Sequence, residues 1–213
     1  MSTYSTMPDL DIHLLDAHNL GLWKGSYLDA LIETLQWRNE TITMFGRTIM
    51  QPRLIAFYAD EGIDYTYSRR TLRGLAWTPL LDELRHIAQQ LSGVPFNSVL
   101  ANYYRDGADS MGMHADDEPE LGPEPVIASM SFGAPRRFVM KHRSRKDLRS
   151  LMIPLADSSI LIMRGPTQHH WLHGIKKETR PVGPRVNLTF RNILTPSTDR
   201  RQDQRRASSN ASS

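Results

Sequence analysis

The stretch Arg185-Val186-Asn187-Leu188-Thr189-Phe190-Arg191 alternates polar and apolar residues without a break. Because successive side chains of a β-strand point to opposite faces, it predicts a strand with its apolar residues on one face and its polar residues on the other. Both arginines fall on the polar face, which we expect to be buried. Two buried guanidinium groups are costly unless an anion pairs with them. The stretch therefore predicts either a pocket for a dicarboxylate or structural ion pairs with Asp or Glu.

Short runs of the same kind begin after Pro95, with turn residues between them. The predicted strands span residues 98–104, 126–132, 137–141, 151–154, 158–163 and 186–193. Short strands with long connections indicate a sandwich or jelly roll rather than a parallel sheet. Apolar residues at helical spacing predict two supporting helices, at residues 26–37 and, between a capping Thr78 and a terminating Gly93, at residues 79–92. The predicted fold class is mainly β (α+β).

The length and composition fit one domain with a sizeable core. The chain has 213 residues, of which 39% are hydrophobic and 23% charged, as in ordinary globular proteins. We expect a flexible N-terminus at residues 1–12, a single domain at residues 13–195 and a disordered polar tail at residues 196–213. Within the domain, residues 41–70 place aromatic side chains among turn residues, which indicates either a set of hairpins or a satellite apolar cluster.

The sequence lacks membrane or signal segments and cysteine, and both absences narrow the possible functions. No apolar run approaches the ~20 residues that cross a bilayer, and the N-terminus lacks the basic-then-apolar pattern of a signal peptide. The sequence therefore predicts a cytoplasmic protein, or a nuclear one in a eukaryotic host, with no membrane partner. The chain also has no cysteine, which excludes disulfides, cysteine zinc sites and a thiol nucleophile. Any bound metal would have His, Asp or Glu ligands.

The net charge of +3 is mild, and bulk charge argues only weakly for a nucleic-acid partner. Two local groups of basic residues are denser, at residues 136–149 and 176–180. Either group could contact phosphates, or it could be a solvated charged face.

His114-Ala115-Asp116 places an imidazole and a carboxylate two residues apart, so both can point to one face of a strand. Two imidazoles and one carboxylate can hold one face of an Fe(II) ion and leave the other open for a co-substrate and O2. The third ligand would come from a distant strand, and His169, His170 and His173 are the candidates. If the backbone extends after Pro166, His169 and His173 share a face. The alternative is a capping Asp beside unrelated surface histidines.

In order and spacing, the motifs of this chain resemble the AlkB family of Fe(II)- and 2-oxoglutarate-dependent nucleic-acid dealkylases. The resemblance covers about residues 45–193. Its pieces are Asn102-x-Tyr104-x-x-Gly107, His114-x-Asp116-Asp117-Glu118, Ser129-x-Ser131-x-Gly133, His170-Trp171-x-His173 and Arg185-x-Asn187-Leu188-Thr189-Phe190-Arg191. It implies a double-stranded β-helix core, the jelly roll that the strands also predict, and it is closest to the branch that repairs duplex DNA.

The resemblance implies a role for single residues around the metal. His114, Asp116 and His173 would bind Fe(II), with O2 as a further co-substrate. Arg185 would pair with the distal carboxylate of 2-oxoglutarate, and Arg191, also counted among the catalytic residues, would lie near its chelating end. An amide and a phenol on one strand face can hydrogen-bond the same carboxylates. The residues implied to bind 2-oxoglutarate are Asn102, Tyr104, Arg185, Asn187 and Arg191.

On the substrate side, Asp117 would face the alkylated base and Glu118 would support it. The segment up to Tyr67 resembles nucleotide-recognition hairpins. Phe45 would be an apolar finger that fills the gap left by a flipped base, and Tyr65 or Tyr67 would stack on that base opposite the metal ligand. The residues implied to bind the substrate are Asp117, Glu118, Phe45, Tyr65, Tyr67 and Arg53.

The resemblance implies a DNA repair dioxygenase that demethylates N1-methyladenine and N3-methylcytosine. It would couple decarboxylation of 2-oxoglutarate to methyl hydroxylation and formaldehyde release. Both lesions are cationic, which a nearby carboxylate favours, and the methyl group blocks pairing, so that the base is flipped at lower cost. The partner would be alkylated duplex DNA with a flipped base, or single-stranded DNA or RNA, bound by a monomer. The alternatives are an RNA demethylase of the same chemistry, a 2-oxoglutarate oxygenase for a protein or small molecule, and a non-catalytic nucleic-acid-binding jelly roll.

Overall fold

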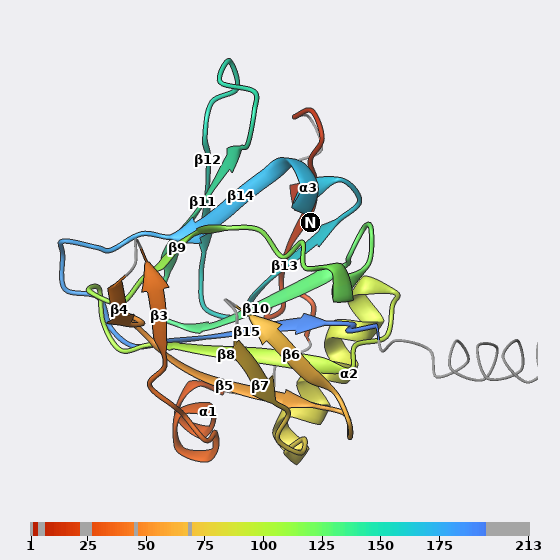
Figure 1. Cartoon of the computed structure of the whole chain (residues 1–213), viewed down its shortest axis with the longest axis vertical. Coiled ribbons are helices and arrows are strands. Elements are labelled where there is room, and N and C mark those ends of the chain that lie inside the picture. Colours follow the sequence, from red (N-terminus) through yellow and green to blue (C-terminus); the bar gives the residue numbers. More distant parts are fainter. Residues whose placement is uncertain (1, 4–6, 22–26, 45–46, 68–69, 195–213) are drawn as a thin grey trace, which may run out of the picture.

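Two antiparallel sheets carry the fold (Figure 1). The computed structural model describes residues 2–3, 7–21, 27–44, 47–67 and 70–194. The larger sheet has the strand order β1 (Ser2–Thr3), β2 (Asp11–Asp16), β13 (Ser159–Arg164), β10 (Ile127–Gly133), β15 (Arg185–Arg191), β8 (Ser98–Tyr104) and β5 (Leu54–Ala59). The smaller sheet has the order β12 (Leu151–Leu155), β11 (Arg136–His142), β14 (Trp171–Ile175) and β9 (Met111–His114). This is the jelly-roll arrangement that the sequence predicts.

Helices and hairpins surround the larger sheet. The helices α1 (Leu28–Thr34) and α2 (Pro79–Ser92) lie on its outer side. In Figure 1, α1 lies below β5, and α2 lies at the right-hand side of the sheet. The short helix α3 (Thr167–His170) connects β13 to β14, and a 3-10 turn spans Pro119–Leu121. The hairpins pair β3 (Thr41–Met44) with β4 (Arg47–Met50), and β6 (Asp64–Tyr67) with β7 (Arg70–Arg73). The hairpin interpretation of residues 41–70 is therefore confirmed.

The strand β15 is buried on both faces because it lies between two different cores. Its apolar face, with Val186, Leu188 and Phe190, packs against α1 and α2. The helix α2 has the ends that its sequence predicts: the hydroxyl of Thr78 accepts a hydrogen bond from the backbone of Leu81, and Gly93 ends the helix at φ +74°. The polar face of β15 points the other way, toward the smaller sheet.

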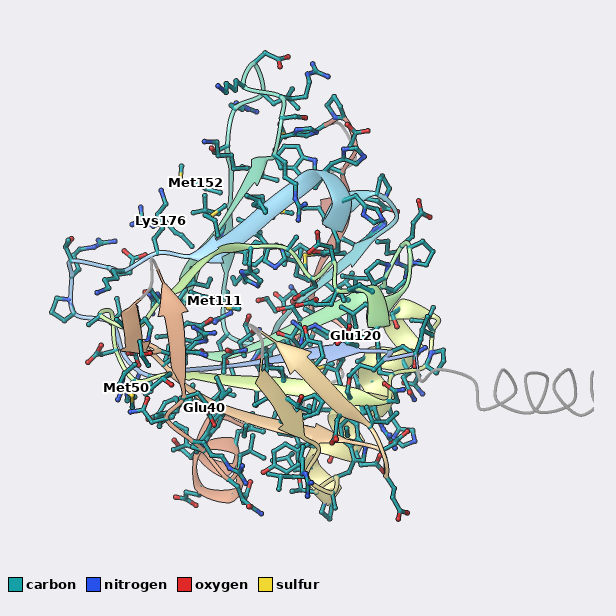
Figure 2. All side chains as sticks on the ribbon, viewed as in Figure 1. Glu40, Met50, Met111, Glu120, Met152 and Lys176 are labelled. Carbon is teal, nitrogen blue, oxygen red and sulfur yellow. The ribbon has the colours of Figure 1, made fainter. Side chains whose placement is uncertain are left out.

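A second core fills the space between the two sheets. The larger sheet contributes residues such as Ile12 and Leu161, and the smaller sheet contributes Phe138, Met140 and Trp171. In Figure 2, Met111 on β9 lies beside the space between the sheets, whereas Met152 on β12 lies on the outside and is 64% exposed. The apolar packing leaves a polar pocket between the sheets, lined by residues of β15, β8, β9 and β14.

The predicted strands begin and end within two residues of the observed ones, and β8 has the predicted bounds. The helix α1 is shorter than the predicted 26–37. The strand β2 was not predicted. It pairs with β13, and Ile12 is fully buried, so the expected boundary between a flexible N-terminus and the domain at residue 12 falls inside the sheet. The predicted polar tail lies outside the described residues. Within the described ranges, no helix is long and apolar enough to span a membrane.

Candidate metal and co-substrate site

His114, Asp116 and His173 come together between the sheets at the polar end of the core. His114 ends β9 and pairs directly with His173 on β14, while Asp116 follows in the connection after β9. Asp116 Oδ1 lies 4.0 Å from His114 Nε2, and its Oδ2 lies 3.9 Å from His173 Nε2. One donor atom from each residue lies within 4.8 Å of the other two. Two nitrogens and one carboxylate oxygen at this spacing fit an Fe(II) ion with an open coordination face.

The protonation of both imidazoles suits metal binding. His114 Nδ1 lies 2.9 Å from the carbonyl oxygen of Gly112. Since a carbonyl can only accept, Nδ1 carries the proton and Nε2 keeps its lone pair facing the site. Burial lowers the pKa of His114, and burial together with neighbouring His114 lowers the pKa of His173 to about 3. Both rings are therefore neutral near pH 7. The ring of Phe138 stacks on His173 at 5.1 Å.

Asp116 is an ionised carboxylate held from one side. Its Oδ1 accepts a 2.6 Å hydrogen bond from Arg191 Nη2, and both side chains are almost fully buried. Burial alone would raise the pKa of Asp116, but Arg191 and the two imidazoles outweigh it and bring the pKa down to about 2. Among the described residues, Asp116 Oδ2 is buried with no hydrogen-bond partner. That free oxygen fits a metal ligand.

Arg185 forms the other half of the site. Its side chain is buried, and Nη2 donates to the hydroxyl of Ser131 at 3.0 Å. Burial lowers its pKa to about 10. Its Nε and Nη1 have no hydrogen-bond partner within the described part of the chain. A buried guanidinium with two free donors and no acidic neighbour among the described residues fits a carboxylate ligand in bidentate geometry.

The remaining residues predicted to bind 2-oxoglutarate line the same pocket. Tyr104 places its ring 5.2 Å from the Arg185 guanidinium. Asn187 donates through Nδ2 to Ser129 Oγ and to the backbone of Met130, so its amide is already occupied. Residues that were not predicted also line this pocket: Met111, Phe138, Met163, Gly174 and Ile175. Alternation on β11 and β14 could have indicated Phe138 and Ile175, but no local signal points to Met163.

Two predicted substrate residues lie deeper than expected. Arg53 is buried, and its Nε donates to Asn102 Oδ1 at 2.7 Å, so it contacts the co-substrate pocket. Tyr65 is fully buried, stacked on Phe57 at 5.7 Å and beside the Arg191 guanidinium. The tyrosine therefore presents no exposed face for base stacking in this structure, because the β6–β7 hairpin folds it into the core.

The two acidic residues after Asp116 have different surroundings. Glu118 is hydrogen-bonded to Tyr65, and burial raises its pKa. Asp117 is exposed at the surface and forms a 2.6 Å ion pair with Arg143, from the loop after β11. Phe45 lies outside the described residues, and so does the side chain of Tyr67. The structure therefore places Asp117 and Glu118 next to the candidate metal ligand Asp116, and it does not test the two aromatic contacts.

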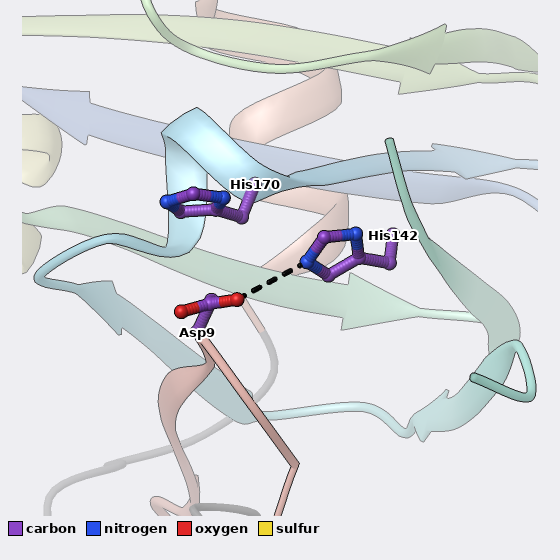
Figure 3. Close-up of side chains that lie close together, drawn as sticks. All are labelled: Asp9, His142 and His170. Carbon is purple, nitrogen blue, oxygen red and sulfur yellow. Dashed lines mark hydrogen bonds and ion pairs between the residues drawn. The ribbon is translucent and has the colours of Figure 1, made fainter. Parts of the chain in front are cut away.

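The other two candidates for the third metal ligand lie away from the site. Residues 167–170 form α3 instead of extending, because Pro166 starts a helical turn, so His169 does not share a strand face with His173. His169 Nε2 contacts the carbonyl of Pro123. His170, the last residue of α3, lies beside His142 and Asp9 in a second cluster (Figure 3).

This second cluster has the residue types of a metal site but the wrong tautomer. His142 Nδ1 accepts hydrogen bonds from the backbone N–H groups of Ser144 and Arg145, at 3.2 and 2.9 Å. Backbone N–H groups can only donate, so the proton of the neutral ring is on Nε2. That nitrogen faces Asp9 Oδ2 at 3.3 Å (Figure 3). Nε2 therefore has no lone pair for a metal ion, and the contact is a structural hydrogen bond.

Comparison with known proteins agrees with this geometry. The family model of the 2OG-Fe(II) oxygenase superfamily matches residues 23–191. The chain is 43% identical over 159 residues to mouse DNA oxidative demethylase ALKBH2, and 40% identical over 174 residues to human alpha-ketoglutarate-dependent dioxygenase alkB homolog 3. These matches cover 72% and 78% of this chain, and 66% and 60% of the relatives. The chain thus spans less than two thirds of their length.

A solved structure described as OsALKBH1 has the same fold. It superposes with a TM-score of 0.55 at 15% sequence identity, over 90% of this chain and all of that one. Fold and family model therefore agree with the resemblance seen in the motifs. The chain belongs to the 2OG-Fe(II) oxygenase superfamily.

Proposed function

We propose that this chain is a DNA repair dioxygenase that demethylates N1-methyladenine and N3-methylcytosine. The observation that carries the proposal is the buried group of His114, Asp116 and His173 next to Arg185, whose guanidinium has two free donors. When bound there, Fe(II) and 2-oxoglutarate supply oxidation of the methyl group by O2, and the products include succinate, CO2 and formaldehyde. The relatives named as DNA oxidative demethylases support a nucleic-acid substrate.

The polar residues of the pocket would position the co-substrate. Arg185 would bind one carboxylate of 2-oxoglutarate through its free Nε and Nη1. Arg191 would keep Asp116 ionised and aligned, since it already bonds Oδ1. Asn102 would be held in one orientation by Arg53. Tyr104 would cover the face of Arg185 and exclude water from that ion pair.

The acidic pair after Asp116 would select a cationic base. Asp117 and Glu118 add negative charge beside the metal ligands, which stabilises an N-methylated, positively charged base more than a neutral one. Arg143 neutralises part of that charge in the free protein. Tyr65 would form a wall of this region through its contact with Glu118, and Tyr67 remains the proposed stacking residue.

We propose duplex DNA with a flipped base as the partner, bound by a monomer. The basic residues around β11 give limited support, because acidic residues neutralise several of them: Arg137 pairs with Glu178 and Arg145 with Asp147. Lys141 is exposed and has no ion-pair partner among the described residues, so it is the stronger phosphate contact. Such contacts make affinity fall with salt concentration.

Anaerobic reconstitution tests the function. The protein is loaded with Fe(II) and 2-oxoglutarate and then given O2 and an oligonucleotide with one N1-methyladenine, as single strand, as duplex and as RNA. We expect mass loss equal to one CH2 in the oligonucleotide, matched by succinate and formaldehyde. Asp116→Ala should form none of these products, and Asp147→Ala, a surface carboxylate, serves as the matched control. Succinate without any loss of methyl groups would instead favour an oxygenase for a protein or small molecule.

A further inference from the structure

The backbone at Asp116 lies outside the strand β9 and makes no ladder hydrogen bond with β14. The pairing of β9 with β14 includes His114 and Met111 and is irregular between them, and β9 ends at His114. Asp116 is therefore outside the ladder, although it must hold its carboxylate within reach of two imidazoles. A buried backbone N–H at such a position needs a partner from another part of the chain.

Gln168 supplies that partner. Its side-chain Oε1 accepts a 3.0 Å hydrogen bond from the backbone N–H of Asp116, across 52 residues of sequence. Gln168 is fully buried and Asp116 is 1% exposed. Because a backbone N–H can only donate, the amide oxygen must face Asp116, and the Nε2 group then points to Met163 Sδ at 3.4 Å.

The position of Gln168 links the two segments that carry the ligands. Gln168 is on α3, which leads directly into β14 and His173. Arg191 already holds Oδ1 of Asp116 at 2.6 Å, so the side chain alone is drawn toward Arg191. A fixed backbone keeps the other oxygen, Oδ2, directed at His173.

We infer that Gln168 is a positioning residue for the metal site: it holds the Asp116 backbone so that Oδ2 can bind the metal. The inference rests on the proposed metal ligands but not on the DNA substrate. Residues that orient ligands typically contribute roughly 10-fold to 100-fold in metal affinity. Loss of the Gln168 hydrogen bond should therefore weaken metal binding without removing the ligands.

The test is titration of the metal-free protein with Co(II), followed by its visible absorption spectrum. Gln168→Met keeps the length and apolar bulk and removes the amide oxygen, so we expect Co(II) to bind roughly 10-fold or more weakly and with an altered spectrum. Gln168→Glu keeps an acceptor oxygen in either protonation state and should restore near-parental affinity. The dissociation constant of 2-oxoglutarate for the Co(II)-saturated proteins should change less, because Arg185 is untouched.

Gln89→Met is the matched control. Gln89 Oε1 accepts a 2.9 Å hydrogen bond from the backbone N–H of Phe96, at the end of α2 and away from the metal ligands. This variant should lose thermal stability while keeping parental Co(II) affinity. If Gln89→Met weakens Co(II) binding as much as Gln168→Met does, or if Gln168→Met binds Co(II) like the parent, the inference is overturned.

A measurement on the unmodified protein covers the case in which Gln168→Met does not fold. Amide hydrogen exchange should show the Asp116 N–H protected in the metal-free protein. Fast exchange at that amide would contradict a stable hydrogen bond from Asp116 to Gln168. Failure of the metal site itself has a different signature, namely equal Co(II) binding by Asp116→Ala and the parent. Failure of the DNA proposal leaves the Co(II) titrations unchanged.

Discussion

Two clusters in this molecule contain the same residue types, one Asp and two His, yet only one is suited to bind a metal. In the first cluster, with Asp116, His114 Nδ1 donates to the carbonyl oxygen of Gly112. In the second cluster, with Asp9, His142 Nδ1 accepts hydrogen bonds from two backbone N–H groups. A donor partner on one side of an imidazole removes the lone pair on the other side. The hydrogen-bond partner of Nδ1 therefore decides whether Nε2 can bind a metal ion.

The clusters also differ in what surrounds the carboxylate. Asp116 is 1% exposed and is paired with Arg191, whereas the Asp9 side chain is 43% exposed. The second cluster instead fixes the chain just before β2, where the indole of Trp171 also donates to the carbonyl of Pro8. One cluster thus presents unpaired ligand atoms, and the other uses its polar atoms to stabilise the fold.

The largest expected difference is between Asp116→Ala and Asp9→Ala. The first removes a metal ligand and leaves Arg191 buried without its partner, so turnover should fall by at least about 1,000-fold, as when one member of a catalytic unit is removed. The second should keep parental turnover and Co(II) affinity. Demethylation rates and Co(II) titration of both variants measure this contrast, and substantial activity in Asp116→Ala would mean that the metal lies elsewhere.

Arg185→Ala tests the co-substrate pocket beside the first cluster. Its two free donors would bond a carboxylate in a buried pocket, and charge-assisted hydrogen bonds contribute about 1.5–3 kcal/mol, or roughly 10-fold to 150-fold in affinity. We expect the apparent KM for 2-oxoglutarate to rise by that factor with a smaller change in kcat. Arg137→Ala, at an exposed arginine paired with Glu178, is the control. An unchanged KM in Arg185→Ala would remove the carboxylate assignment.

Substitution of one histidine in each cluster should separate stability from activity. His142→Phe leaves two partly buried backbone donors without an acceptor, which should cost about 1–3 kcal/mol of unfolding free energy while Co(II) binding persists. His114→Phe should abolish Co(II) binding with a smaller effect on stability. Urea unfolding and Co(II) titration of both proteins provide the readout. Loss of Co(II) binding in a folded His142→Phe protein would contradict the structural role.

Local patterns in the sequence predicted much of this, and long-range contacts account for what they missed. Alternation in β15 predicted the two buried arginines and their face. The strand β2 was not predicted, because its buried residues Ile12 and Leu15 are three positions apart, whereas the alternation of a strand places them two apart. Gln168 has no local signal, since its role depends on a contact across 52 residues. Tyr65 or Tyr67 was expected to stack on a flipped base, but packing against Phe57 buries Tyr65.

The basic residues on and after β11 show that long-range contacts also decide the surface charge. Their density along the sequence suggested phosphate contacts or a solvated face, and neither interpretation anticipates the partners that the fold supplies. Glu178 and Asp117 neutralise Arg137 and Arg143 from segments 41 and 26 residues away. A count of charges along the chain therefore overstates the positive surface that DNA would meet.

The smallest expected effect is on the unfolding free energy, and it tests whether the His142 ring is neutral. Asp9 has φ +58°, a conformation that Asn also tolerates, so Asp9→Asn removes the charge while keeping an acceptor for the His142 Nε2 proton. A neutral ring requires only an acceptor, and unfolding free energy should change by less than about 0.5 kcal/mol, whereas a charged pair would lose about 1.5–3 kcal/mol. The corresponding change in the other cluster, Asp116→Asn, should remove most of the Co(II) affinity.

Ring nitrogen chemical shifts of His142 provide the independent check, because they distinguish a proton on Nε2 from one on Nδ1. A large destabilisation by Asp9→Asn would show that His142 is charged, and the contrast between the two clusters would then rest on burial and Arg191 rather than on the tautomer.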